Sequence, residues 1–313
     1  MLSRTADSLF WLSRYVERAD FVARILETAN RLASLPTSYI GHGNEWESAL
    51  ATAGCAEAFA QHHDAATPEA VTHFLAFSGD NPSSICRSLE TARFNARAVR
   101  TALTTEMWET INGAWLEMQE FRPEKFPMEE IPRFLEWVKE VSLRFDGSGY
   151  RTMLRNDAFW FTRLGIFLER ADSTARILDV KFHFLLPENS TVGGGVDYTQ
   201  WTAILRAVSA ATSYHWVYRE SLQPWLVADL LILKEQMPRS LAACYREIVT
   251  NLDLLGAAGG RRGAAQRTAH AAYRKLSNER IERIFQTGLH EFITDFIAQN
   301  ARIGAEITAQ YLA

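Results

Sequence analysis

The sequence predicts an all-α fold, a helical bundle built from two related halves, and three observations support this prediction. Apolar residues recur at helical spacing along most of the chain, as in the stripe formed by Tyr15, Ala19, Val22 and Leu26. The alternation of apolar and polar residues that marks strands is scarce. One segment of the chain also occurs twice. Between the stretches rich in helix breakers, the remaining windows accommodate about five helices in each half.

The repeated segment runs from Glu17 to Glu27 and returns from Glu169 to Asp179, with eight of its eleven positions identical. The repeat extends beyond this segment, because Trp46 and Trp201 are separated by 155 residues, close to the 152 that separate Glu17 from Glu169. A spacing held over such a length indicates an internal duplication rather than a short shared motif.

The boundary between the two halves is predicted near residue 150. Residues 146–150 contain two glycines and are predicted to break the helical pattern there. The first repeat then covers residues 1–150 and the second residues 151–313. Since each amphipathic helix must bury its apolar stripe, we expect the halves to pack as one bundle with pseudo-twofold symmetry.

The composition is that of an ordinary globular protein, with 47% hydrophobic and 22% charged residues. The net charge of -4 gives no overall positive field, so nucleic acid is not an expected partner. Three cysteines at distant positions fit neither a disulfide framework nor a CxxC metal site. The most apolar stretch, Trp225 to Leu233, is too short to span a membrane. These features, with no signal-peptide pattern at the start, predict a cytoplasmic protein without a membrane partner.

The charged residues of a duplicated Glu-Arg-Ala-Asp motif form the candidate site. They are Glu17, Arg18, Asp20, Arg24, Glu169, Arg170, Asp172 and Arg176. In each repeat the Glu, the Asp and the later Arg fall at i, i+3 and i+7, which places them on one helix face beside the apolar stripe. The Arg directly after the Glu points elsewhere.

Two interpretations of the motif are open. In the structural one, Asp20 with Arg24 and Asp172 with Arg176 form i,i+4 ion pairs, which would fix the register of the two halves if they are buried. In the functional one, the two motif helices meet across the pseudo-twofold axis and line a polar groove for a ligand or a partner's side chains. We favour the structural interpretation, because charge networks commonly serve packing and orientation.

Other chemistry has weaker support in the sequence. None of the eight histidines has a Glu three residues before it, as ferritin-like metal sites require. Glu69 with His73 and Asp179 with His183 are isolated pairs, so no metal is predicted. The run from Gly256 to Gly263 could cradle phosphate with its amides and arginines, but it lacks the ending of a P-loop and is interpreted as a connector. No nucleophile signature is present, and no cofactor is predicted.

The motif segments resemble the bacterial alpha-E family, also catalogued as a domain of unknown function. The resemblance covers essentially the whole chain and rests on Met1 to Arg4, Phe10 to Asp20 and Arg163 to Asp179. Members of this family are typically encoded beside, or fused to, circularly permuted ATP-grasp ligases and transglutaminase-like peptidases. The resemblance brings no established catalytic residue, and it implies a place in peptide ligation or modification.

We therefore expect a non-catalytic accessory or scaffold protein that binds an ATP-grasp amide ligase or its peptide substrate, with a transglutaminase-like peptidase as a further partner. The alternative is an enzyme of the same pathway. In that enzyme Glu17 and Glu169 would act as acid and base, and Arg18 and Arg170 would clamp a carboxylate or phosphate.

Overall fold

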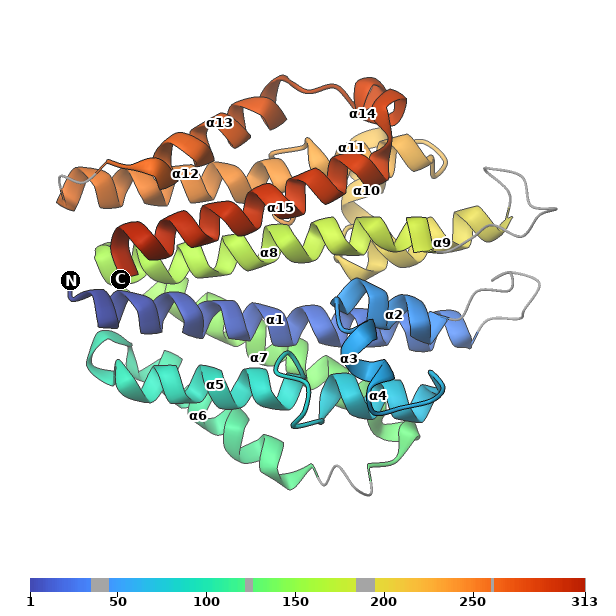
Figure 1. Cartoon of the computed structure of the whole chain (residues 1–313), viewed down its shortest axis with the longest axis horizontal. Helices are drawn as coiled ribbons and strands as arrows, with labels where there is room; N and C mark the ends of the chain where they lie inside the picture. The colour runs from blue at the N-terminus through green and yellow to red at the C-terminus, as the bar shows by residue number, and fades with distance from the viewer. Residues whose placement is uncertain (35–44, 122–125, 184–194, 260–261, 313) are drawn as a thin grey trace.

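The computed structural model describes residues 1–34, 45–121, 126–183, 195–259 and 262–312 (Figure 1). Over those ranges the protein is all-α and has no strand, which confirms the predicted fold class. The helices are α1 (Ser3–Ala33), α2 (Glu45–Ala53), α3 (Ala56–Ala60), α4 (Pro68–Ala76), α5 (Ile85–Ala98), α6 (Thr105–Glu120), α7 (Ile131–Thr152), α8 (Asp157–His183), α9 (Gly195–Ala207), α10 (Ala211–Tyr218), α11 (Pro224–Ile232), α12 (Leu241–Gly259), α13 (Ala264–Asn278), α14 (Ile281–Thr287) and α15 (Leu289–Ile307).

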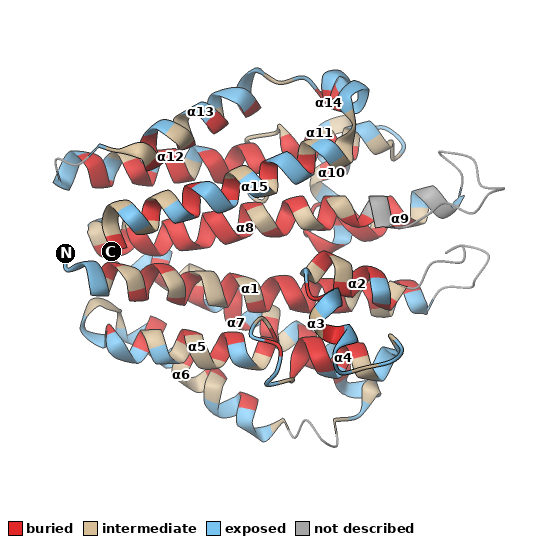
Figure 2. Ribbon diagram, in the orientation of Figure 1, coloured by how far each residue is buried: buried red, intermediate tan, exposed pale blue. Residues whose placement is uncertain are grey.

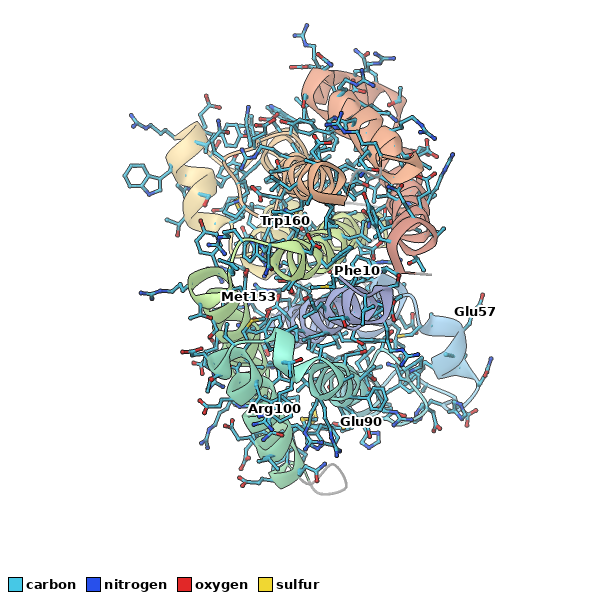
Figure 3. The ribbon with its side chains drawn as sticks, turned by 90° about the vertical axis from the view of Figure 1, so that its left-hand side faces the viewer. Phe10, Glu57, Glu90, Arg100, Met153 and Trp160 are labelled. Atoms are coloured by element: carbon cyan, nitrogen blue, oxygen red, sulfur yellow. The ribbon has the colours of Figure 1, made fainter. Side chains whose placement is uncertain are left out.

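The two motif helices, α1 and α8, lie side by side at the centre and run in the same direction (Figure 1). At their first turns the amino group of Met1 lies 3.2 Å from Asp157. Farther along, a Cβ added to Gly165 would lie 2.3 Å from the carbonyl oxygen of Phe10, so the two backbones meet at a position where only glycine fits. Figure 3 looks along the bundle and shows Phe10 inside it, whereas Glu57 lies at its edge.

The remaining helices surround this central pair in two similar sets. Helix α1 packs against α5 and α7, and α8 packs against α12 and α15. Contacts also cross between the sets, because α2 packs on α8, and both α9 and the C-terminal turn Thr308–Leu312 pack on α1. In Figure 2 both central helices are mostly buried, and most of the exposed residues lie on the outer helices and at the ends of α1. One continuous cluster of buried apolar side chains contains residues from both halves, such as Leu9 and Leu164.

Local backbone features recur at the spacing of the predicted repeat. Gly54 and Ser209, which follow α2 and α9, both have left-handed φ values, 69° and 56°. The hydroxyls of Ser84 and Ser240, which precede α5 and α12, each accept a hydrogen bond from an amide three residues on, at 3.2 and 3.0 Å. These recurrences support the internal duplication, which stays a prediction.

Two predictions about the helices were wrong, one about a helix break and one about the number of helices. Helix α7 continues through residues 146–150, where a break was predicted. Gly149 is buried there, and a Cβ on it would lie 3.3 Å from the Met107 side chain, so this glycine allows close packing and does not end the helix. The number of helices per half also exceeds about five, because short helices such as α3 and α14 stand between the long ones.

No described helix combines the length and the apolar character that crossing a membrane requires.

Candidate functional site

The two Glu-Arg motifs lie at the same level of the central pair, and each supplies the partner of the other. Arg170 Nη2 donates a hydrogen bond to Glu17 Oε1 at 2.5 Å. In the opposite direction, Arg18 Nε donates to Glu169 Oε1 at 2.7 Å. Arg18 and Arg170, which were expected to point away from the motif face, therefore reach across the interface. Each arginine is turned by about 100° from the preceding glutamate, and the neighbouring helix lies in that direction.

Three of the four motif acids are almost completely removed from water. The exposed fraction is 2% for Glu17, 1% for Asp20 and 5% for Glu169. A carboxylate so deeply buried is stable as an ion only when cations and hydrogen bonds compensate for its lost hydration. The surroundings of each acid show which residues provide that compensation.

Around Glu17 the nearest compensating group is Arg170, and Arg239 Nη1 lies 3.9 Å from Glu17 Oε2. Arg170 is itself shared with a third helix. Arg170 Nη2 also donates to Asp146 Oδ2 on α7 at 3.0 Å, and Asp146 is paired with Arg163. Burial alone would raise the pKa of Asp146, but Arg170 and Arg163 outweigh it and hold that pKa below its usual value. Burial likewise opposes the charge of Arg170, yet Glu17 and Asp146 raise its pKa well above the ordinary value.

Asp20 ties α1 to the second half of the chain. Arg24 Nε donates to its Oδ2 at 2.8 Å, and Arg239 Nη2 donates to the same oxygen at 2.9 Å. Burial favours protonation of Asp20, but Arg239 and Arg24 lower its pKa overall. Arg24 Nη1 also reaches the end of α9, where it donates to the Ala207 carbonyl at 2.9 Å and to Ser209 Oγ at 3.0 Å.

Glu169 is held by two arginines of α1. Arg14 Nε donates to its Oε2 at 2.6 Å, while Arg18 Nε donates to Oε1. Burial alone would raise the pKa of Glu169, and the two guanidinium groups lower it below the usual value. Aromatic rings support both cations, since Arg14 lies 4.7 Å from the ring centroid of Trp11 and Arg18 lies 5.2 Å from that of Tyr15.

The second half has its own i,i+4 ion pair, between Arg176 Nε and Asp172 Oδ2 at 2.6 Å. With the Asp20–Arg24 pair, this confirms both local pairs that the spacing predicted. The two environments differ, because the Asp172 side chain keeps 23% of its exposure and that of Asp20 only 1%. Burial and the nearby Glu169 carboxylate raise the pKa of Asp172, and Arg176 offsets them only in part.

Of the eight predicted site residues, four pair across α1 and α8 and the other four form the two local pairs. Four further residues of the network were missed. Arg14, Asp146, Arg163 and Arg239 complete the ion pairs but lie outside the repeated tetrapeptide. Arg14 could have been found from sequence, since it stands one helical turn before Arg18 on the same face. Arg239 could not, because 219 residues separate it from Asp20.

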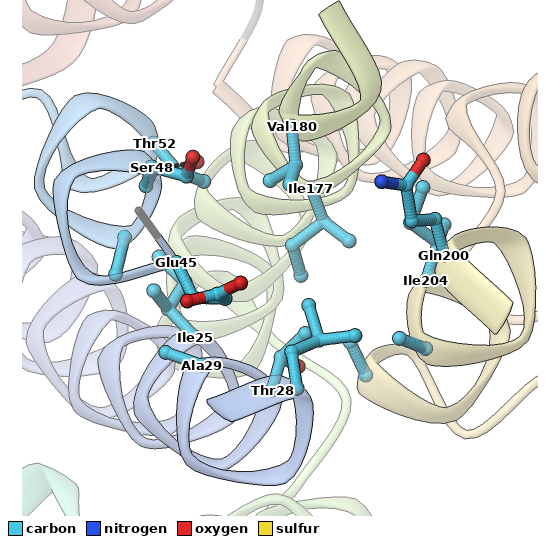
Figure 4. A pocket seen from close by; sticks show the side chains of 14 residues that line it. Ile25, Thr28, Ala29, Glu45, Ser48, Thr52, Ile177, Val180, Gln200 and Ile204 are labelled. Atoms are coloured by element: carbon cyan, nitrogen blue, oxygen red, sulfur yellow. Dashed lines mark hydrogen bonds between the residues drawn. The ribbon is translucent and has the colours of Figure 1, made fainter. Parts of the chain in front are cut away.

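A pocket lies beyond the motifs on the same axis, between α1, α2, α8 and α9 (Figure 4). Its lining includes Ile25 with Ile177 and Glu45 with Gln200, which occupy equivalent positions of the predicted repeats. The cavity volume is about 20 Å³, enough for a single water molecule. None of the eight motif residues lines it, so the motif and this pocket are neighbours and not one site.

Metal ligands do not assemble in the part of the chain that the structure describes. No group of three His, Cys, Asp or Glu side chains is placed to hold an ion there. Asp179, one of the isolated candidates, bonds to His290 Nδ1 at 2.7 Å. The side chain of His183, its predicted companion, lies outside the described residues.

Comparison with known protein families identifies the family of this chain. The family model Alpha-E, a predicted alpha-helical domain with a conserved ER motif, matches residues 1–312. Neither a curated protein nor a solved structure matches the chain. Glu17-Arg18 and Glu169-Arg170, the residues that pair across the central helices, are both Glu-Arg sequences of the kind that this description names.

Proposed function

Since the chain belongs to the Alpha-E family, we propose that it is a non-catalytic accessory or scaffold protein that binds an ATP-grasp amide ligase or the ligase's peptide substrate. One observation carries the non-catalytic part of the proposal. The acids and arginines of the duplicated motif bind each other across α1 and α8, so the motif stabilises the fold and the partner binds elsewhere.

The alternative, an enzyme of the same pathway, needs the same residues to do different work. A general acid or base must reach the proton that it transfers. Both oxygens of Glu169 already accept bonds from Arg14 and Arg18, and its lowered pKa keeps it ionised near neutral pH. An anion clamp needs free guanidinium donors, whereas Arg170 is occupied by Glu17 and Asp146. These contacts favour the scaffold over the enzyme.

The ligase as partner follows from the gene neighbourhood that the family resemblance implies, and the transglutaminase-like peptidase is proposed on the same ground.

We also propose a bacterial cytoplasmic location. Its support is that the three cysteines, Cys55, Cys86 and Cys244, are free thiols. Burial raises the pKa of the Cys55 and Cys244 thiols to about 12, which keeps both unreactive.

Mass photometry tests the proposed partner. The full chain is mixed with the ATP-grasp ligase encoded beside it, with and without peptide and ATP. We expect a species at the summed mass of the two proteins. Separate masses under every condition would contradict the proposal.

A matched pair of variants tests the role of the motif. If Glu17→Gln and Glu169→Gln lower the melting temperature but leave ligase binding intact in the folded fraction, the motif is structural. If the chain itself has an enzymatic activity, and the substitutions abolish this activity without changing the melting temperature, the result would instead support the hypothesis that the protein is an enzyme.

A further inference from the structure

A second cavity lies between α12 and α13, remote from the motif, and its lining is rich in arginine. Its volume is about 500 Å³. Arg262, Arg267, His270 and Arg274 line it, and Asp253 is the one acid among the described residues around it. Small-molecule sites commonly have volumes of ~300–1,000 Å³, so this cavity is large enough for a metabolite.

The charges of this cavity are not balanced. Asp253 is engaged by His270, whose Nε2 lies 3.0 Å from both carboxylate oxygens. Within the described residues, no carboxylate lies at ion-pair distance from Arg262, Arg267 or Arg274. The cavity therefore carries an excess of positive charge in a chain whose net charge is -4. Clefts lined by one sign of charge raise the local concentration of ligands of the opposite sign.

The arrangement of the cations suits an extended anion. Arg267, His270 and Arg274 fall at i, i+3 and i+7, which puts them on one face of α13. Seven residues of helix separate the Cα atoms of the two arginines by ~10 Å along the axis. A row of guanidinium groups over that length matches several linked phosphates better than a single one, because each guanidinium can contact a different phosphate.

The backbone at the start of α13 has partners within the chain and is not part of the site. The Gly263 amide donates to Gln266 Oε1 at 3.0 Å, and the Ala265 amide donates to Gln310 Oε1 at 3.3 Å. A Cβ on Gly263 would lie 2.2 Å from Oε1 of Gln310, so this flexible side chain would have to move. The arginines, and not a glycine-rich cradle, are the groups left to bind an anion.

We propose that this cavity binds a small molecule bearing a di- or triphosphate, held by Arg262, Arg267 and Arg274. The site lies outside the α1–α8 interface and is independent of the proposed scaffold function.

Isothermal titration calorimetry of the full chain tests the proposal, with inorganic triphosphate and ATP as two separate probes and inorganic phosphate for comparison. The test variant is Arg267→Ala/Arg274→Ala. The matched control is Arg133→Ala/Arg144→Ala, which removes two exposed arginines of α7 that have no ion-pair partner among the described residues. Circular dichroism confirms that each variant is folded.

We expect one site per chain for at least one of the two probes, binding more tightly than phosphate. The test variant should weaken that affinity by about tenfold or more, while the control changes it little. ATP binding above triphosphate binding identifies a nucleotide, and equal binding identifies the phosphate chain as the recognised part. No binding, several equivalent sites, or equal weakening in both variants would overturn the proposal, because the interaction would then be general attraction between charges.

Discussion

At Glu169 two guanidinium groups hold one buried carboxylate, and this contact shows what the motif does at the scale of the residue. Burying a charge costs several kcal/mol, and only well-placed partners repay that cost. Such a pair adds little net stability over an apolar pair, but removing one partner leaves an uncompensated charge in the interior. The crossed pairs therefore penalise any arrangement in which α1 and α8 are not in register.

The lowered pKa of Glu169 predicts a dependence of stability on pH. A folded-state pKa below the unfolded value of 4.5 means that protons bind preferentially to the unfolded chain as the pH falls. The stabilisation from ionised Glu169 is complete above that value and is lost as the pH falls through the folded-state pKa. Urea unfolding should therefore show a smaller difference between wild type and Glu169→Gln at pH 4 than at pH 7. A difference independent of pH would contradict this role of Glu169.

At the scale of the element, glycines inside helices serve close packing in two places. Gly165 lets α8 approach the backbone of α1 at Phe10, and Gly149 of α7 makes room for the Met107 side chain of α6. Sequence patterns predicted the motif helices and their local ion pairs, because both follow from residues three or four apart. They predicted a helix break at residues 146–150, since glycine in a sequence does not reveal whether a neighbour presses against it.

Gly165→Ala should destabilise the protein, because its new Cβ would meet the Phe10 carbonyl oxygen, a backbone atom that cannot move alone. Overpacking of this kind costs ~1–3 kcal/mol. Gly147→Ala on α7 is the matched control, since a Cβ there meets nothing within 4 Å. It should stabilise the helix by ~0.5–1 kcal/mol. Urea denaturation measures both, and equal effects of the two substitutions would refute the close approach.

At the scale of the whole molecule, the halves are joined by more than a shared surface. Helix α2 of the first half packs on α8, and α9 of the second packs on α1. The motif ion pairs also draw one partner from each half, except for the two local pairs. Sequence reasoning predicted that the halves pack together, but it could not find Asp146 or Arg239, because distant contacts leave no trace in local spacing.

This packing predicts that neither half folds alone. Residues 1–152 and 157–313, expressed separately, should lack cooperative thermal unfolding, because each would expose one side of the interface and leave buried charges unpaired. Mixing the two fragments should restore a cooperative transition in circular dichroism. A cooperative transition in either isolated fragment would show an independent domain.

The central claim is that the Glu-Arg motifs exist to pair across α1 and α8, and a double-mutant cycle on Glu17 and Arg170 tests it most directly. The variants are Glu17→Gln, Arg170→Met and the double substitution, each unfolded in urea at pH 7. We predict that each single change costs ~3–5 kcal/mol and that the double change costs well below the sum, with a coupling of at least ~1.5 kcal/mol. Additive effects of the two substitutions, or single variants as stable as the wild type, would contradict the account.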